Sequence, residues 1–185
     1  MTCIAGVKHK GRVWIGGDSA GCASWDITIR RDAKVFRNGP FVIGFTSSFR
    51  MGQLIRYAFK PPRLPESIDD LDRYMVVDFV GGLRQCLKDG GWAEKKDEQE
   101  KGGFFLVGIH DRLFKLEADY QVGETADAYD ACGCGEGYAK GALFTADENA
   151  DPFTRITRAL DAAAHHSNGV HGPFVILSTN PGPGE

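Results

Sequence analysis

The chain has 185 residues, with 25 acidic and 22 basic side chains, so its formal net charge is −3. This length is typical of one domain with an ample core, and the slightly acidic balance gives no reason to expect a nucleic-acid surface. No apolar run approaches the roughly 20 residues that a membrane-spanning helix needs, and the N-terminus lacks the pattern of a signal peptide.

The first fifty residues are predicted to form short strands joined by turns. CIAGV and RVWIGGD flank a Lys-His-Lys-Gly turn at 8–11, which indicates a hairpin. Two more strands, AKVFR and FVIGFT, are separated by an Asn-Gly-Pro turn at 38–40. The apolar period then changes, because residues from Ser47 or Ser48 onward favour a helix that the prolines at 61–62 end.

A longer helix is expected from Ser67, where Asp70 gives a start similar to a capping box, to the glycines at 90–91. The charged stretch AEKKDEQEK (93–101) is predicted to be a solvated loop or helix end. GGFFLVGIH and RLFKLE follow as strands, then come two helices, the second beginning at Asp151, and PFVILST closes as a strand. The buried stripe expected on the longer helix is Ile68, Leu71, Met75, Phe79 and Leu83.

The order of these elements predicts the fold class. Helices arrive in pairs rather than between successive strands, which argues against a doubly wound parallel sheet. We therefore expect an α+β fold, a four-layer αββα sandwich of two antiparallel sheets between helix pairs. The prediction is one domain over residues 1–180, with 181–185 as a flexible tail.

The most informative position is Thr2, directly after Met1. Methionine aminopeptidases usually remove Met before a small residue, so the mature chain is expected to begin with Thr2. Its α-amino group, with an unperturbed pKa near ~7.7, could then take the proton from the hydroxyl of the same residue. Such a site also needs a cation near the amine, an acid that holds the cation, and a backbone N–H for the oxyanion. The candidates are Lys34, Asp18 and Gly44, in that order.

Thr2, Asp18 and Lys34 follow one another at equal steps of sixteen and resemble the N-terminal residues of proteasome β subunits and HslV-type peptidases. FVIGFTSS is similar to the family's apolar strand, whose glycine N–H helps to form the oxyanion hole. GCGEGYAKGAL resembles its Gly-Ser-Gly turn and the helix that follows, and RALDAAAHHSNGVHG with PFVILST resembles its last helix and strand. The resemblance covers nearly the whole chain and implies the N-terminal-nucleophile hydrolase fold, with Thr2 at the sheet edge.

The resemblance implies a threonine peptidase that hydrolyses peptide bonds through an acyl-enzyme ester. Thr2 would be the nucleophile, and its amine would be the general base. Lys34 would lower the pKa of that amine, Asp18 would orient Lys34, and Gly44 would donate to the oxyanion.

Two positions depart from the family pattern. Cys134 stands where the family has a serine near the threonine amine, and Ser167 stands where proteasome subunits have an aspartate. A thiol is a weaker donor than a hydroxyl, so the polar network around the amine is expected to differ. By positional match alone, the substrate pocket is expected at Gly21, Asp32, Phe36, Val42 and Thr46.

Partners follow from the resemblance as well. It implies polypeptide substrates, stacked homo-oligomeric rings of six or seven subunits, and an ATP-driven unfoldase, although the sequence contains no docking motif for one. Neither a cofactor nor a membrane or nucleic-acid partner is expected. The five cysteines form an odd set without a secreted framework, so we expect reduced thiols and a cytoplasmic protein.

Other readings of the sequence are weaker or remain open. A catalytically silent ring subunit and a small-molecule amidohydrolase of the same fold are the open alternatives. Cys3 would become the nucleophile only if Thr2 were also removed. GCGEG lacks the lysine of a phosphate-binding loop, and the Cys-x-Cys spacing of Cys132 and Cys134 is unusual for zinc, so no metal is expected. The histidines that could complete such a site are His165, His166 and His171.

Overall fold

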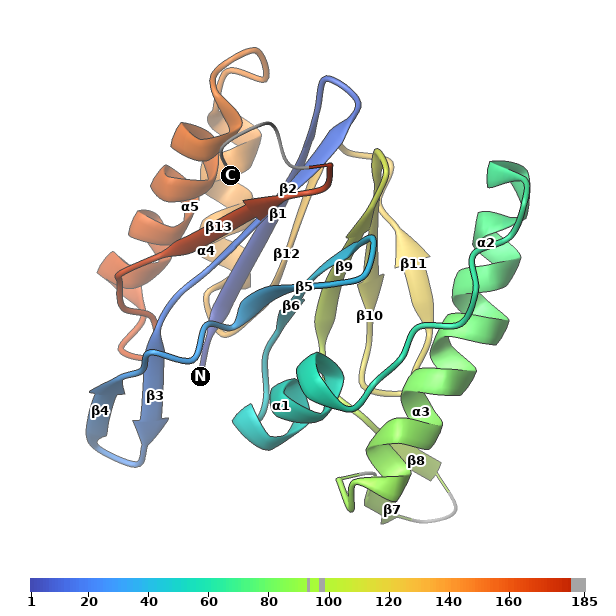
Figure 1. The fold of residues 1–185 in the computed structure, drawn as a ribbon. Helices are drawn as coiled ribbons and strands as arrows, with labels where there is room; N and C mark the ends of the chain where they lie inside the picture. Colours follow the sequence, from blue (N-terminus) through green and yellow to red (C-terminus); the bar gives the residue numbers. More distant parts are fainter. Residues whose placement is uncertain (93, 97–98, 181–185) are drawn as a thin grey trace.

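The computed structural model describes residues 1–92, 94–96 and 99–180 of the chain. Two antiparallel sheets lie face to face between two layers of helices, which Figure 1 shows from one side to the other. This arrangement confirms the α+β sandwich predicted from the paired helices. Among the described residues, no helix is long and apolar enough to cross a membrane.

The first sheet has four strands in the order β12-β1-β2-β13. These are β1 (Cys3–His9), β2 (Arg12–Gly17), β12 (Tyr129–Gly133) and β13 (Val175–Ser178). Two helices, α4 (Glu136–Thr145) and α5 (Pro152–His166), cover its outer face. The Asp151 carboxylate caps α5 by accepting the Thr154 N–H at 2.9 Å, which confirms the predicted helix start.

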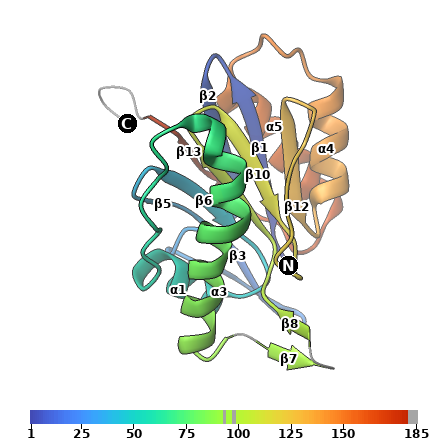
Figure 2. The ribbon, with the colours of Figure 1, turned by 90° about the vertical axis from the view of Figure 1, so that its right-hand side faces the viewer.

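The second sheet has five strands in the order β11-β10-β9-β6-β5. They are β5 (Val35–Asn38), β6 (Phe41–Phe45), β9 (Phe105–Ile109), β10 (Arg112–Leu116) and β11 (Val122–Glu124). Helices α1 (Phe49–Tyr57) and α3 (Val80–Asp89) cover this sheet, and Figure 2 shows α3 in front of it. Aromatic side chains fill the layer between, where the rings of Phe41 and Phe79 lie 4.9 Å apart.

A third group of apolar side chains fills the space between the two sheets. It includes Ile4 and Ile15 from the first sheet and Val42 and Leu106 from the second. The inner strands of the two sheets thus have apolar residues on both faces, one toward the helices and one toward the opposite sheet. This double burial explains why the inner strands read as nearly continuous apolar runs.

The helix predicted to begin at Ser67 is present but irregular. The Ser67 hydroxyl caps it by accepting the Asp69 N–H at 3.2 Å, and the chain then passes through four segments. These are the 3₁₀ turn η1 (Ile68–Asp70), α2 (Leu71–Arg73), the π-helix η2 (Tyr74–Phe79) and α3. Of the predicted stripe, only Ile68 is exposed, at 54 %, because the tighter 3₁₀ turn rotates it off the buried face.

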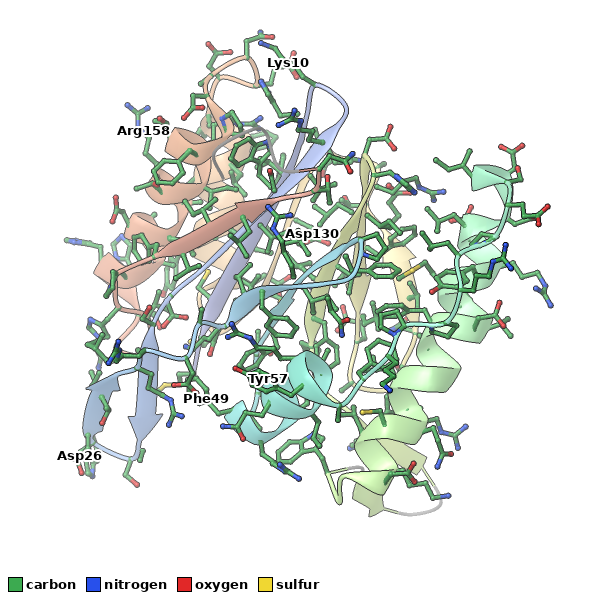
Figure 3. All side chains as sticks on the ribbon, viewed as in Figure 1. Lys10, Asp26, Phe49, Tyr57, Asp130 and Arg158 are labelled. Atoms are coloured by element: carbon green, nitrogen blue, oxygen red, sulfur yellow. The ribbon has the colours of Figure 1, made fainter. Side chains whose placement is uncertain are left out.

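Two hairpins were not expected from the sequence. The first joins β3 (Ala20–Ala23) to β4 (Asp26–Ile29), and Figure 3 shows Asp26 at its outer end. In the second, β7 (Glu94–Lys96) pairs antiparallel with β8 (Gln99–Lys101), so the charged stretch predicted as a solvated loop or helix end contains two short strands. Residues 93 and 97–98 of that stretch, and the predicted tail at 181–185, lie outside the described residues.

Candidate active site

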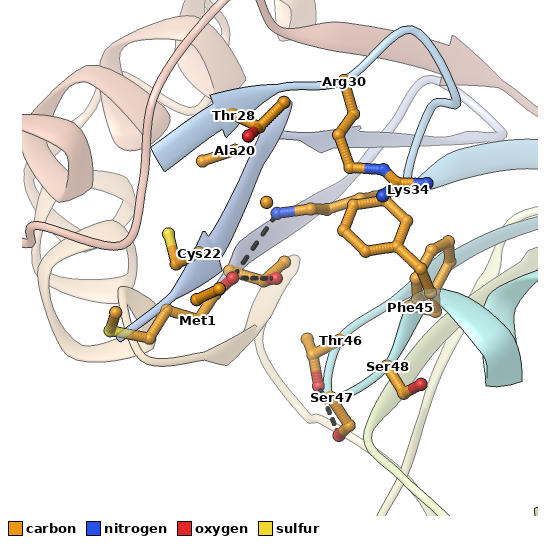
Figure 4. A pocket seen from close by; sticks show the side chains of 14 residues that line it. Met1, Ala20, Cys22, Thr28, Arg30, Lys34, Phe45, Thr46, Ser47 and Ser48 are labelled. Atoms are coloured by element: carbon orange, nitrogen blue, oxygen red, sulfur yellow. Dashed lines mark hydrogen bonds between the residues drawn. The ribbon is translucent and has the colours of Figure 1, made fainter. Parts of the chain in front are cut away.

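A pocket of about 260 Å³ lies beside the N-terminus, between the β3–β4 hairpin and the loop that joins β6 to α1 (Figure 4). Thr2 and Lys34 both contribute to its lining. Thr2 directly precedes β1, which is an inner strand of its sheet, so the expectation that it lies at a sheet edge is wrong. It lies instead at the end of the sandwich where strands from both sheets stop.

Asp18 and Lys34 form a buried ion pair at the base of this pocket. The Lys34 Nζ lies 2.9 Å from each carboxylate oxygen of Asp18, and the two side chains are 1 % and 0 % exposed. The carboxylate also accepts the N–H groups of Cys3 at 3.0 Å and Ala20 at 2.9 Å. Four hydrogen bonds therefore hold Asp18, which is how a buried carboxylate can be tolerated and can fix the lysine.

The Lys34 ammonium is directed toward the N-terminal residues. Its Nζ lies 3.5 Å from the carbonyl oxygen of Met1, and it lies 5.7 Å from the centre of the Phe49 ring. Figure 4 shows this contact together with the hydrogen bond that the Thr2 hydroxyl donates to the same carbonyl. A carbonyl at this position thus lies beside both a hydroxyl and a fixed cation.

The backbone of Thr2 contacts the side chain of Cys134, and Cys134 in turn contacts Ser167, the other departure from the family pattern. The Thr2 N–H donates to Cys134 Sγ at 3.2 Å, and the same sulfur donates to the Thr2 carbonyl at 3.3 Å. Ser167 Oγ lies 3.5 Å from that sulfur and accepts the Gly169 N–H at 3.4 Å. The structure therefore brings Thr2, Cys134 and Ser167 together, although they are far apart in the sequence.

A glycine allows this close approach. Gly133 has a φ of +99°, a conformation that side-chain-bearing residues rarely adopt, and a Cβ added to it would lie 2.3 Å from the Thr2 carbonyl oxygen. The end of β12 can therefore lie directly against Thr2, which places the Cys134 side chain against the Thr2 backbone. The Gly-Cys-Gly sequence at 133–135 is a local requirement of the site.

Gly44 is not at the pocket. It pairs with Val35 and Leu106 inside the second sheet, and a Cβ added to it would lie 2.4 Å from Ile4 across the sandwich. The residues of this segment that line the pocket are instead Phe45, Thr46, Ser47 and Ser48, at and just beyond the end of β6. Ser47 has a φ of +70°, and its N–H donates no hydrogen bond to any other described residue.

The predicted substrate-binding residues divide between pocket and core. Gly21 and Thr46 line the pocket, and Asp32 lines a neighbouring one. Phe36 and Val42 line neither pocket, because Phe36 packs in the aromatic layer under the helices and Val42 in the space between the sheets. The residues that reach the pocket come from the N-terminus, the β3–β4 hairpin, the segment 30–34 before β5 and the segment from the end of β6 to the start of α1. The lining residues that the sequence did not indicate include Cys22, Thr28, Arg30, Phe45, Ser48 and Phe49.

Two of the other cysteines, Cys3 and Cys132, are poor nucleophiles. Burial, together with the negative charge of Asp18, raises the pKa of the Cys3 thiol to about 12. Burial also raises the pKa of Cys132 well above its ordinary value. Within the described part of the chain, no group of three or more His, Cys, Asp or Glu side chains is arranged to hold a metal ion.

Comparison with known proteins shows which fold the chain has. Neither a protein-family model nor a curated protein matches the sequence. Among solved structures, Thiobacillus denitrificans BPH in complex with epoxomicin superposes with a TM-score of 0.80 and covers 97 % of this chain and 100 % of that chain, at 21 % identity. The chain has an HslV-type, proteasome-like fold.

Two further structures agree with this fold. Eukaryotic HslV from Trypanosoma brucei gives a TM-score of 0.67 at 18 % identity, over 96 % of this chain and 98 % of that chain. Anbu, an ancestral beta-subunit from Yersinia bercovieri, gives a TM-score of 0.66 at 14 % identity, over 96 % of this chain and 81 % of that chain. The fold likeness therefore extends over almost the whole chain, while the identities are low.

Proposed function

We propose that this protein is a threonine peptidase that hydrolyses peptide bonds after removal of Met1. The observation that carries the proposal is the position of Thr2, which lies in a pocket beside the buried Asp18–Lys34 pair and against Cys134. Removal of Met1 would convert the Thr2 N–H into a free α-amine at the same place. Nucleophile, base and fixed cation would then lie within one site.

In the proposed reaction, the Thr2 hydroxyl oxygen attacks the substrate carbonyl carbon and its proton passes to the Thr2 amine. Lys34 disfavours a second positive charge on that amine, which keeps it available as a base. The ammonium formed then gives the proton to the leaving amine as the peptide bond breaks, and an ester on Thr2 remains. Water attacks the ester, the amine takes its proton, and the carboxylic acid product leaves as Thr2 is restored.

The oxyanion is assigned to the backbone of Ser47 rather than to Gly44. Its N–H has no partner among the described residues and lies in the loop that forms the pocket wall opposite the β3–β4 hairpin. A preorganised N–H directed into a site stabilises the negative charge that develops on the carbonyl oxygen. The strained positive φ of Ser47 is consistent with a backbone held for that purpose.

The proposal also covers how copies of the protein assemble and where in the cell the protein is located. We propose that copies form a homo-oligomeric ring, because a head-to-tail ring requires two different contact surfaces on each copy. Exposed apolar side chains occur on separate elements, with Trp25 at the β3–β4 turn and Phe144 on α4. An ATP-driven unfoldase would supply polypeptide substrates to such a chamber, and the five unpaired cysteines favour the cytoplasm.

Hydrolysis of a peptide substrate tests this function. The purified protein should release the fluorophore from aminocoumarin peptides, whereas Thr2→Ala should fold normally and release none. Thr2→Ser is the matched control, because it keeps a hydroxyl on the same residue and should retain part of the activity. Equal activity in Thr2→Ala and in the unmodified sequence would disprove the proposal.

A further inference from the structure

A second pocket adjoins the catalytic one. It has a volume of about 110 Å³, and Phe45 and Phe49 line both pockets. The two rings lie 5.8 Å apart, edge to face, so they form a partition with Thr2 on one side and the second pocket on the other. A substrate side chain next to the attacked carbonyl would pass along these two rings to reach the second pocket.

The partition is held by α1. A Cβ added to Gly52 would lie 2.3 Å from the Phe45 ring, so that ring rests directly on the helix backbone. The next turn of the same helix supplies Gln53, Arg56 and Tyr57 to the second pocket. The pocket therefore has an aromatic wall on one side and polar groups from α1 on the other.

Positive charges outnumber negative charges around the second pocket. Asp32, the one carboxylate among the described residues that line this pocket, is held by Arg30 through two hydrogen bonds of 2.8 and 2.6 Å. That interaction, with further help from the nearby Arg56 charge, keeps the pKa of Asp32 below its ordinary value, so it stays ionised. Arg56 contacts the rings of Phe36 and Tyr57 and forms no ion pair within the described part of the chain. One carboxylate thus faces two guanidinium groups.

We propose that the second pocket receives the side chain whose carbonyl Thr2 attacks and selects an acidic side chain over a basic one. This inference rests on the proposed peptidase function and identifies Arg56 as the specificity-determining residue. Asp32, which the sequence predicted by positional match as a substrate-pocket residue, is already neutralised by Arg30. The remaining positive charge of Arg56 attracts a substrate carboxylate and repels an ammonium.

The test uses three aminocoumarin peptides that differ only in the residue before the coumarin, which is Glu, Gln or Lys. We expect kcat/KM for Glu to exceed that for Lys by about tenfold, with Gln between them, and the ratio to fall as salt rises. Arg56→Glu should invert the ratio, and Asp32→Asn should increase it. Arg50→Glu is the matched control, since Arg50 is exposed on the same helix outside the pocket and should leave the ratio unchanged.

The ratio between substrates is measured within one enzyme preparation, so partial unfolding of a variant does not change it. A Glu-to-Lys ratio near one, or a ratio that Arg56→Glu does not alter, would overturn the inference while leaving the peptidase function intact. Failure to cleave any of the three peptides, together with no modification of Thr2 by a peptide epoxyketone, would instead overturn the proposed function and the inference with it.

Discussion

Lys34 and Asp18 come from different sheets and meet in the interior, where the Lys34 Nζ is 2.9 Å from both carboxylate oxygens. Asp18 follows β2 of the first sheet, and Lys34 precedes β5 of the second. Their ion pair therefore ties the two sheets together at the end of the sandwich where Thr2 lies. The same contact serves the fold and orients the cation beside Thr2.

Removal of the lysine alone should damage both stability and activity. Lys34→Ala leaves the buried Asp18 carboxylate without its partner, which should lower the free energy of unfolding by about 3–5 kcal/mol. The double variant Asp18→Asn/Lys34→Met replaces both charges and should recover most of that loss in denaturant unfolding. It should nevertheless stay inactive on peptides. Activity in the double variant would show that the cation is dispensable for catalysis.

Cys134 should tune catalysis without controlling the fold. Its sulfur exchanges two hydrogen bonds with the Thr2 backbone, and its side chain is exposed. Because a hydroxyl is the stronger donor, Cys134→Ser should raise kcat/KM, whereas Cys134→Ala should lower it. Thermal unfolding of the two variants should be similar. Identical kinetics in both variants and in the unmodified sequence would remove this residue from the site.

The cysteines should differ in their reaction with iodoacetamide. Between pH 7 and 9 the exposed Cys134 should be labelled, because the thiolate attacks and this thiol is accessible. Cys3, whose pKa burial raises to about 12, keeps its proton throughout this range and should stay unlabelled, as should Cys132. Peptide mapping by mass spectrometry locates the label, and denaturant should expose all five thiols. Labelling of Cys3 in the folded protein would contradict the packing described.

Two helical glycines should respond oppositely to alanine. At Gly52 the new Cβ would lie 2.3 Å from the Phe45 ring, so Gly52→Ala should cost about 1–3 kcal/mol in unfolding free energy. At Gly81 on α3 nothing lies within 4 Å, so Gly81→Ala should stabilise the protein by about 0.5–1 kcal/mol. Urea unfolding of both variants is the measurement. Equal effects would mean that Phe45 does not rest on α1.

Apolar runs bounded by turn residues, helical apolar spacing and helix caps made most of the fold predictable. The inner strands, the Ser67 and Asp151 helix starts and the pairing of helices are all local signals. The β3–β4 hairpin was missed because all four residues of β4 are exposed, which leaves no buried face to produce a pattern. The π-helical segment within the long helix likewise has no sequence signature of its own.

The site was harder to predict because it depends on where strands end. Gly44, Phe36 and Val42 all lie within strands. The backbone of Gly44 pairs with a neighbouring strand, and the side chains of Phe36 and Val42 pack in the core. Ser47 lies just beyond a strand, where its N–H is released from the ladder. The run Thr46-Ser47-Ser48 before a helix cap is the signal that could have indicated it.

The most direct test of the account is the intact mass of the purified protein before and after incubation with a peptide epoxyketone. That electrophile requires a hydroxyl and a free α-amine on one residue, so it reports on Thr2 alone. The account predicts a chain that lacks Met1 and gains one adduct, and no adduct on Thr2→Ala. A chain that retains Met1, or one that lacks it yet gains no adduct, would contradict the assignment of Thr2 as the nucleophile.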